Sequence, residues 1–324
     1  MVEIILSSFV SSLIAVLIPG IILTSILWKL DIYNLKPFRL FIIHLIYGIF
    51  CALILSVLFR LIIDLNFLSK LIQNEFDLFL FWVFYGPLFE EIAKGIFLIY
   101  SSNWRENYSL TDGIIYGALI GLGFSLIENF FYFYNFKGKI FELIGVIFLR
   151  NTFTIPMHII STSVLGLILF TVANKKLIKK LFYYLLGIIT ATIIHAFWNV
   201  IDYSSHNLYY IIAYLAFLII VYTLTVFFSF KHEQKILLNE LLDESLNGEL
   251  KFDYAFIIPY YKKRNSLKIL KNHIGNEIIK TATKLAFRKH QLKKTDKENL
   301  IMFYLNDVQF LRNKLKFLEL YLNE

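Results

Sequence analysis

The sequence predicts an all-α fold: a polytopic transmembrane helix bundle of about seven spans, followed by a cytoplasmic helical hairpin. Three observations support this fold class. Hydrophobic residues make up 58% of the 324 positions, which is more apolar surface than a soluble core can bury. Apolar runs of roughly 20 residues, the length that crosses a bilayer, recur over the first 230 positions. After residue 230, apolar residues recur at helical spacing between lysines and glutamates, which is typical of amphipathic helices.

The apolar runs define the expected spans, each long enough to cross about 30 Å of hydrocarbon. They cover residues 3–28, 39–63, 77–101, 112–136, 141–173, 180–202 and 208–230. The fifth run is longer than a span requires and contains Arg150 and Pro156. We therefore expect a tilted or broken helix there, or a short interfacial piece followed by a span. The first ten residues contain no lysine or arginine, so we expect a retained helix rather than a signal peptide.

Basic residues in the loops predict the orientation, because cytoplasmic loops contain the excess of lysine and arginine. One set of alternate loops contains eight such residues, and the other set contains four. The first set is Lys29, Lys36, Arg39, Arg105, Lys175, Lys176, Lys179 and Lys180, and the second is Arg60, Lys70, Lys137 and Lys139. The basic C-terminal region falls on the side of the first set. We expect the N-terminus outside and the C-terminus in the cytoplasm.

The composition divides the chain into a transmembrane bundle over 1–230 and a basic cytoplasmic tail over 231–324, with 18 of the 32 lysines and arginines in the tail. The tail predicts two helices with a break near Lys294 to Glu298. Basic and acidic residues alternate in it, so a solvated helical appendage is favoured over a nucleic-acid module. A role in docking a protein partner or the membrane surface stays open. The single cysteine, Cys51, excludes an intrachain disulfide.

Two spans contain charged residues where a membrane helix normally has none. The third contains Glu90, Glu91 and Lys94, and the fourth contains Glu128. Each charge costs roughly 2–3 kcal/mol at bilayer depth on insertion scales. Residues that are this unfavourable indicate a site, although a packed ion pair explains Glu90 and Lys94, four residues apart, equally well when they are taken alone.

The helical period places these groups on protein-facing surfaces. Positions i and i+4 share a face, so Glu90 lies above Lys94. Pro87 leaves the carbonyl of residue 83 without its helical donor, which loosens the helix one turn before the glutamates. In the fourth span, Gly113, Gly117 and Gly121 recur every four residues, a spacing typical of tight helix packing in lipid. Glu128 falls on nearly the same face as these glycines, so we expect it to face protein.

The later spans add imidazoles and an amide. His158 follows Pro156 in the fifth span, and His195 and Asn199 lie one turn apart in the sixth. A pair of carboxylates in a poorly solvated site allows one to act as a base toward water. Imidazole and amide groups can donate to the oxyanion of a hydrated peptide carbonyl. Together these groups are the components of a water-activating amidase.

At these motifs the sequence resembles the PrsW family of intramembrane proteases, within the superfamily of CAAX-processing and bacteriocin-processing membrane proteases. The resemblance spans roughly residues 80–205 and rests on several motifs in order on successive helices. The matching segments are 89–94, 112–117, 121–129, 150–158 and 195–199.

The resemblance implies roles for individual residues. Glu90, Glu91 and Lys94 match the EExxK motif. The FxxxEN motif is matched by Phe124, Glu128 and Asn129, while His195 and Asn199 match the HxxxN motif of the superfamily and His158 a histidine of the PrsW branch. The implied activity is an intramembrane endopeptidase of a prokaryotic cell membrane, acting on membrane proteins or membrane-associated peptides. We expect Glu90, Glu91, Glu128, His158, His195 and Asn199 to be catalytic, supported by Lys94, Phe124, Asn129 and Arg150.

Metal dependence and two other functions stay open. Glu91, Glu128, His158 and His195 are the expected ligands if zinc is present, but Lys94 would repel a cation, so a metal-free mechanism with a glutamate-activated water is favoured. Protonatable residues inside a bundle also occur in proton-coupled or ion transporters. A catalytically silent family member acting in immunity or partner binding is the third hypothesis. No nucleic-acid partner is expected.

Overall fold

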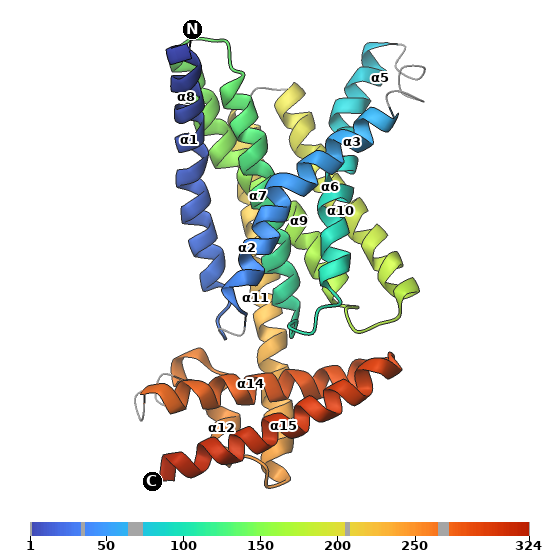
Figure 1. The fold of residues 1–324 in the computed structure, drawn as a ribbon. Helices are drawn as coiled ribbons and strands as arrows, with labels where there is room; N and C mark the ends of the chain where they lie inside the picture. The colour runs from blue at the N-terminus through green and yellow to red at the C-terminus, as the bar shows by residue number, and fades with distance from the viewer. Residues whose placement is uncertain (1, 34–35, 64–73, 205–207, 265–271, 324) are drawn as a thin grey trace.

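The computed structural model describes residues 2–33, 36–63, 74–204, 208–264 and 272–323. Within these residues every regular element is helical, which confirms the all-α fold. Six helices or continuous helical runs are long and apolar enough to span a membrane. Figure 1 shows them as a bundle, with the C-terminal helices gathered at the end away from the N-terminus.

The six spanning segments follow the predicted runs closely. They are α1 (Val2–Lys29), α2 with α3 (Phe38–Ile46 and Leu53–Ile63), α7 (Leu110–Tyr134), α8 with α9 (Ile140–Leu149 and Ile155–Phe170), α10 (Leu177–Ser204) and α11 (Leu208–Leu246).

The predicted third span is a helical run that is long enough but not apolar enough to count among the six. It consists of α5 (Glu75–Leu80), a π-helical turn over Phe81–Tyr85, and α6 (Gly86–Ser101). Its charges, Glu90, Glu91 and Lys94, set it apart from the others, and all three are buried. The described residues therefore contain six candidate spans, one fewer than the predicted number of about seven, and the difference is this polar run.

Helix α7 is the centre of the bundle, where it packs against α1, α2, α6, α9 and α11. Three of its glycines, Gly113, Gly117 and Gly121, face one close helix neighbour, as their spacing predicted, and this neighbour is α9. A Cβ added at Gly113, Gly117 or Gly121 would lie 2.4, 2.2 or 2.2 Å from a backbone oxygen of α9, a separation that no side chain tolerates. The glycines therefore let the two backbones touch, which is how small residues hold helices together in lipid.

The long fifth run is continuous rather than broken. Helices α8 and α9 are joined by a π-helical turn over Arg150–Thr154. The extra residue in a π turn lets a helix accommodate Pro156, whose missing amide hydrogen would otherwise leave a carbonyl unpaired. A π turn also precedes Pro87 in α6, so the loosening expected before the paired glutamates is present.

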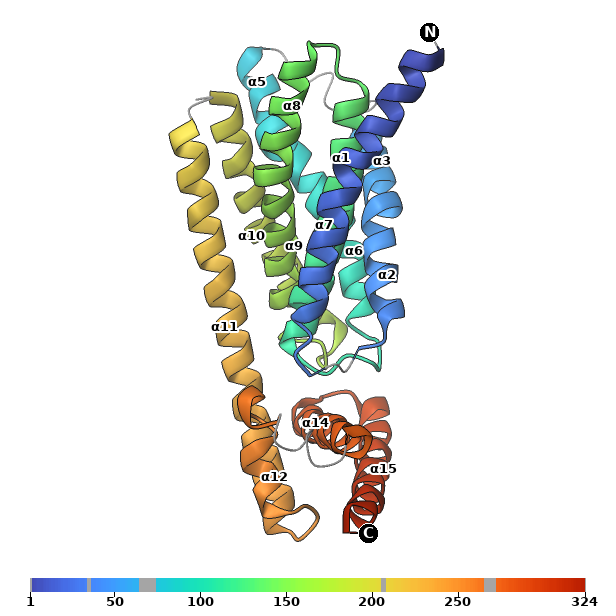
Figure 2. The ribbon, with the colours of Figure 1, turned by 90° about the vertical axis from the view of Figure 1, so that its left-hand side faces the viewer.

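The C-terminal helices form a second, polar layer against one end of the bundle. Helix α11 does not end at residue 230 but continues to Leu246, beyond the bundle (Figure 2). It is followed by α12 (Phe252–Ile257), α14 (Asn272–Lys294) and α15 (Glu298–Asn323). The last two pack together as the predicted hairpin, with the break between Lys294 and Glu298. They also contact the loops that join the spans, so the tail is docked rather than freely solvated.

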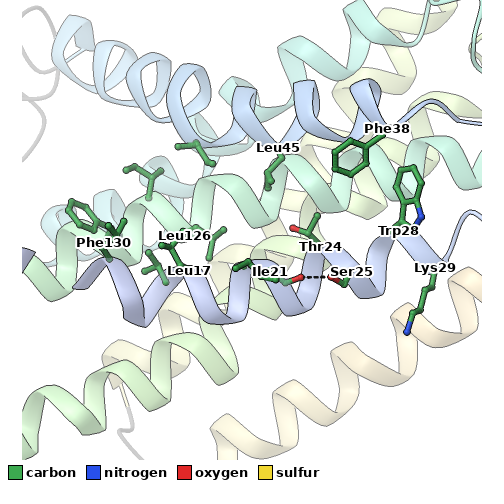
Figure 3. Close-up of a pocket in the computed structure, with 15 residues that line it drawn as sticks. Leu17, Ile21, Thr24, Ser25, Trp28, Lys29, Phe38, Leu45, Leu126 and Phe130 are labelled. Carbon is green, nitrogen blue, oxygen red and sulfur yellow. Dashed lines mark hydrogen bonds between the residues drawn. The ribbon is translucent and has the colours of Figure 1, made fainter. Parts of the chain in front are cut away.

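An apolar groove of about 630 Å³ lies between α1, α2 and α7 (Figure 3). Leu17, Ile21, Leu45 and Leu126 are among the side chains that line it, and of the described residues that line it Lys29 alone is titratable. Hydrolysis needs several titratable groups, so this groove lacks the side chains for chemistry. The polar residues singled out by the sequence lie elsewhere.

Candidate active site

Helix α6 separates the roles of its two glutamates. Neighbouring residues on a helix point about 100° apart, so Glu90 and Glu91 face different helices. Glu90 is hydrogen-bonded to Arg60 of α3. Glu91 faces α9 and α10 and is 0% exposed. The two adjacent glutamates therefore point to different places: Glu90 toward the polar cavity described below, and Glu91 into the contact between α6, α9 and α10.

Glu91 is fully engaged by hydrogen-bond donors. Its Oε1 accepts from Lys94 Nζ at 2.7 Å and lies 3.2 Å from His195 Nδ1. Ser161 and Thr162 of α9 each donate to it at 3.2 Å. A buried carboxylate with this many donors is held in one position. Since a carboxylate accepts only, His195 carries its proton on Nδ1 and leaves Nε2 free.

His158 lies between Lys94 and Glu128. Its Nδ1 is 2.9 Å from Lys94 Nζ, and its Nε2 is 3.2 Å from Glu128 Oε2. The ring is 0% exposed and packs against Phe124, with ring centroids 5.2 Å apart. It also meets the His195 ring edge-on at 4.7 Å. The FxxxE pair, the lysine and both histidines thus come together from four helices.

A second set of polar contacts holds Glu128. Arg150 donates to Glu128 Oε2 at 2.8 Å and to Asn129 Oδ1 at 2.7 Å. Asn129 in turn donates to Asn151 at 3.3 Å, and Asn151 donates to the carbonyl oxygen of Ala15 in α1 at 2.9 Å. Arg150 is therefore a partner of the site rather than only an interfacial anchor.

These groups surround a cavity of about 380 Å³. Glu90, Glu128, His158, His195 and Asn199 line it, and Asn199 Nδ2 donates to the carbonyl oxygen of Trp82 at 3.0 Å. The cavity extends toward residues near the end of α10, including Tyr203, at the end of the bundle opposite the C-terminal helices (Figure 1). Four of the predicted site residues do not line the cavity but lie next to residues that do: Glu91, Lys94, Phe124 and Asn129.

Three cavity residues could hold a metal ion. Glu90, His158 and His195 each offer a ligand atom, and these atoms lie within 4.8 Å of one another. Glu90 Oε2 is buried without a hydrogen-bond partner, as expected of an oxygen that awaits a ligand. His195 is already in the suitable tautomer. His158 would fit as a ligand through Nε2 only with its proton on Nδ1, and the Nδ1 contact would then need Lys94 Nζ as an uncharged amine, the one form of a lysine nitrogen that accepts a hydrogen bond. With that tautomer the three groups fit zinc, which favours three protein ligands and an open position in catalytic sites.

This set differs from the one expected from the sequence, which had Glu91 and Glu128 beside the two histidines. Glu91 is turned away from the cavity toward Ser161 and Thr162, and its contact with His195 is through Nδ1. A carboxylate that holds the far nitrogen of a metal-ligating histidine is a common arrangement. Glu128 stays next to the group through His158.

Several partners in the site were not identified from the sequence. Arg60 was counted only as a loop residue, although it lies inside the second apolar run and the rule that singled out Glu128 applies to it equally. Ser161, Thr162 and Asn151 have no sequence signal, because hydroxyl and amide groups are common in membrane helices and usually bond their own backbone.

A comparison with protein families gives one match. The model described as PrsW family intramembrane metalloprotease matches residues 36–226, which is more than half of the chain and includes every helix that contributes to the cavity. No curated protein and no solved structure matches the sequence.

Proposed function

Because the chain belongs to the PrsW family of intramembrane metalloproteases, we propose that its cavity hydrolyses peptide bonds of membrane proteins or membrane-associated peptides. The main support is the convergence of Glu90, His158 and His195 within 4.8 Å, with Glu128 beside them. Four helices contribute these groups, at a depth where isolated charges are unfavourable.

We propose that Glu90, His158 and His195 hold a zinc ion. When bound, zinc polarises a peptide carbonyl and makes water nucleophilic near neutral pH. The other residues then have distinct tasks. Glu91 fixes the orientation of His195 through Nδ1. Glu128 Oε2 accepts the proton of the attacking water and is kept in place by Arg150.

Asn199 is placed to bind the substrate. Its side chain lines the cavity next to Glu90 and His195, and it can donate to a peptide carbonyl by exchanging its present bond with the Trp82 backbone. Donors that point toward a developing oxyanion stabilise the transition state more than the ground state.

A metal-free glutamate mechanism is the second candidate, and one observation favours it. As an ammonium, Lys94 donates to His158 Nδ1, which leaves the proton of His158 on Nε2, directed at Glu128. In that arrangement His158 cannot ligate a metal, and Glu128 activates water with His158 as its proton partner. The two mechanisms differ in the tautomer of His158 and in their need for zinc.

The loop charges support an orientation with the C-terminal helices in the cytoplasm. The cavity would then be reached from the outer half of the membrane, and the substrate would be cut there. Trp82, Tyr132, Trp198 and Tyr203 line the cavity, which suits an extended segment with large side chains.

The test is cleavage of a tagged single-span protein by the purified chain in liposomes. We expect cleavage by the wild type and at least a hundredfold less by Glu128→Gln, as for loss of a general base, worth about 10²–10⁴. Glu142→Gln is the matched control, because Glu142 is an exposed glutamate of α8 outside the cavity. Equal cleavage by wild type and Glu128→Gln refutes the role of Glu128. Ion uptake without any cleavage would instead support the transporter hypothesis.

A further inference from the structure

A second polar cavity lies at the junction between the bundle and the C-terminal helices. Its volume is about 350 Å³. One wall is the loop between α6 and α7, a second is the end of α9, and the third comes from α11, α14 and α15. It is separate from the candidate active site and shares no residue with it.

The lining of this junction cavity is basic and has no acidic side chain among the described residues. Among the described residues, six basic side chains line it: Arg105, Lys175, His232, His290, Lys294 and Lys297. Lys175 lies 3.8 Å from Asp296 and His290 lies 3.9 Å from Glu240. In the described part of the chain, Arg105, Lys294 and Lys297 form no ion pair. Most of the positive charge is therefore not neutralised by the protein.

Two lysine side chains meet at one amide oxygen beside this cavity. Lys180 Nζ and Lys297 Nζ both donate to Asn103 Oδ1, at 2.7 and 3.2 Å. Lys180 is only 1% exposed, and its other partner is the neutral hydroxyl of Ser102 at 3.1 Å. When both are charged, two lysine side chains that share one uncharged acceptor repel each other, and a buried cation without an anion is costly. A bound anion would remove both penalties.

The cavity also offers groups for the rest of a ligand. Asn107 is 5% exposed, and its Oδ1 has no hydrogen-bond partner, so it can accept a bond from a hydroxyl or amino group. Trp104, Tyr108 and Tyr304 supply aromatic surface. Burial lowers the pKa of His290, and the nearby Lys294 and His232 lower it further, whereas Glu240 raises it.

We propose that the junction cavity binds a phosphate-bearing ligand, with the phosphate against Lys294 and Lys297, which line it, and its charge offsetting that of Lys180, which lies behind Asn103. Phosphate is the anion that best matches several ammonium donors at once. The phosphate belongs either to a soluble ester, such as a nucleotide, or to a lipid headgroup at the membrane surface. In both cases the ligand contacts the loop that joins α6 to α7, the helices that hold Glu90 and Glu128.

The test uses the full-length protein in uncharged detergent and follows thermal unfolding during titration with ATP or sodium pyrophosphate. Sodium chloride of equal ionic strength corrects for screening. We expect a saturable rise in melting temperature with at least one of the two phosphates. The double variant Lys294→Gln/Lys297→Gln should bind about tenfold more weakly or worse, since each hydrogen bond to a charged group contributes appreciably. Lys176→Gln/Lys179→Gln is the control, because it removes the same charge from exposed residues outside the cavity.

A second arm distinguishes the source of the phosphate. The same variants are compared in nanodiscs of phosphatidylcholine with and without phosphatidic acid. Stabilisation by phosphatidic acid that only the Lys294/Lys297 variant loses assigns the site to a lipid headgroup, whereas a response to the soluble phosphates alone assigns it to a soluble ester. The proposal is overturned if no phosphate stabilises the protein beyond sodium chloride, or if the two double variants respond equally. Neither outcome depends on peptidase activity.

Discussion

Replacing Gly121 with alanine should damage both folding and the candidate active site. A Cβ at this position would lie 2.2 Å from the carbonyl oxygen of His158 and 2.8 Å from its carbon. Both atoms belong to the backbone of α9, so no side-chain rotation can relieve the clash. Helix α9 must move away from α7 by about 1 Å to restore an ordinary contact.

The magnitude follows from that displacement. Overpacking a tight interface typically costs about 1–3 kcal/mol of stability. The movement also shifts His158, whose Nε2 lies 3.2 Å from Glu128 and whose Nδ1 lies 2.9 Å from Lys94. A misplacement of about 1 Å at a reacting group can reduce the rate by about a hundredfold. We therefore expect Gly121→Ala to lose stability and most of its cleavage activity.

Gly145 of α8 provides the matched control, since a Cβ there has no atom within 4 Å. Alanine is the better helix former by about 1 kcal/mol, so Gly145→Ala should be as stable as the wild type or more so. Both variants are measured by thermal unfolding in detergent and by cleavage in liposomes. Equal melting temperatures and equal cleavage for the two variants would refute the packing argument.

Three further changes have defined outcomes. Burial lowers the pKa of Lys36, but the carboxylates of Asp112 and Asp31 raise it by more, so the pKa lies above its usual value. The stabilising effect of Lys36 is therefore complete at neutral pH and declines only in strongly alkaline solution. Lys36→Met should cost about 3–5 kcal/mol of stability, and an unchanged unfolding midpoint in detergent would contradict this. Arg288 is buried and donates to the carbonyl oxygens of Arg105 and of Asn107, the latter at 3.3 Å. Arg288→Gln should therefore release the C-terminal helices, which limited proteolysis detects as faster digestion of residues 272–323. An unaltered digestion rate would show that Arg288 does not hold these helices in place. Thr162→Val removes a hydrogen-bond donor to Glu91 and should reduce cleavage about 10–100-fold. Ser163→Ala is the control and should not reduce cleavage, because the Ser163 hydroxyl bonds its own helix. Similar losses in both variants would count against the role of Glu91.

The bundle was largely predictable, because span length, helical period and glycine spacing depend on local sequence. The spacing of Gly113, Gly117 and Gly121 predicted a close helix neighbour, and α9 occupies that position. Asp112 lies in the first turn of α7 and accepts hydrogen bonds from the backbone of Ser109 and Tyr108. The motifs likewise indicated which helices contribute polar groups to one cavity.

The distribution of roles within the site was not predictable. Glu90 and Glu91 are adjacent in the sequence, and only the rotation of α6 decides which one faces the cavity. That rotation depends on the π-helical turn before Pro87 and on Arg60, which approaches Glu90 from another helix. The composition change at residue 230 marks the end of the apolar run but not the end of α11, which continues to Leu246, because a helix continues as long as its backbone bonds do.

The sequence also did not predict that the tail docks against the bundle. Arg288 binds backbone carbonyls of the loop between α6 and α7, and any residue can present a carbonyl. The sequence favoured a solvated appendage and left a docking role open, and the junction cavity shows that part of the tail's positive charge stays unpaired within the described residues.

The metal content of the purified protein tests the central claim most directly. The claim is that Glu90, His158 and His195 hold a zinc ion that peptide hydrolysis requires. Mass spectrometry of the metals in full-length wild type should find about one zinc per chain, as in mononuclear catalytic sites. His195→Asn should lose the metal and the cleavage activity together while melting at the temperature of wild type stripped of its metal. A metal-free preparation that cleaves the substrate at the wild-type rate contradicts the claim and leaves the glutamate mechanism in its place.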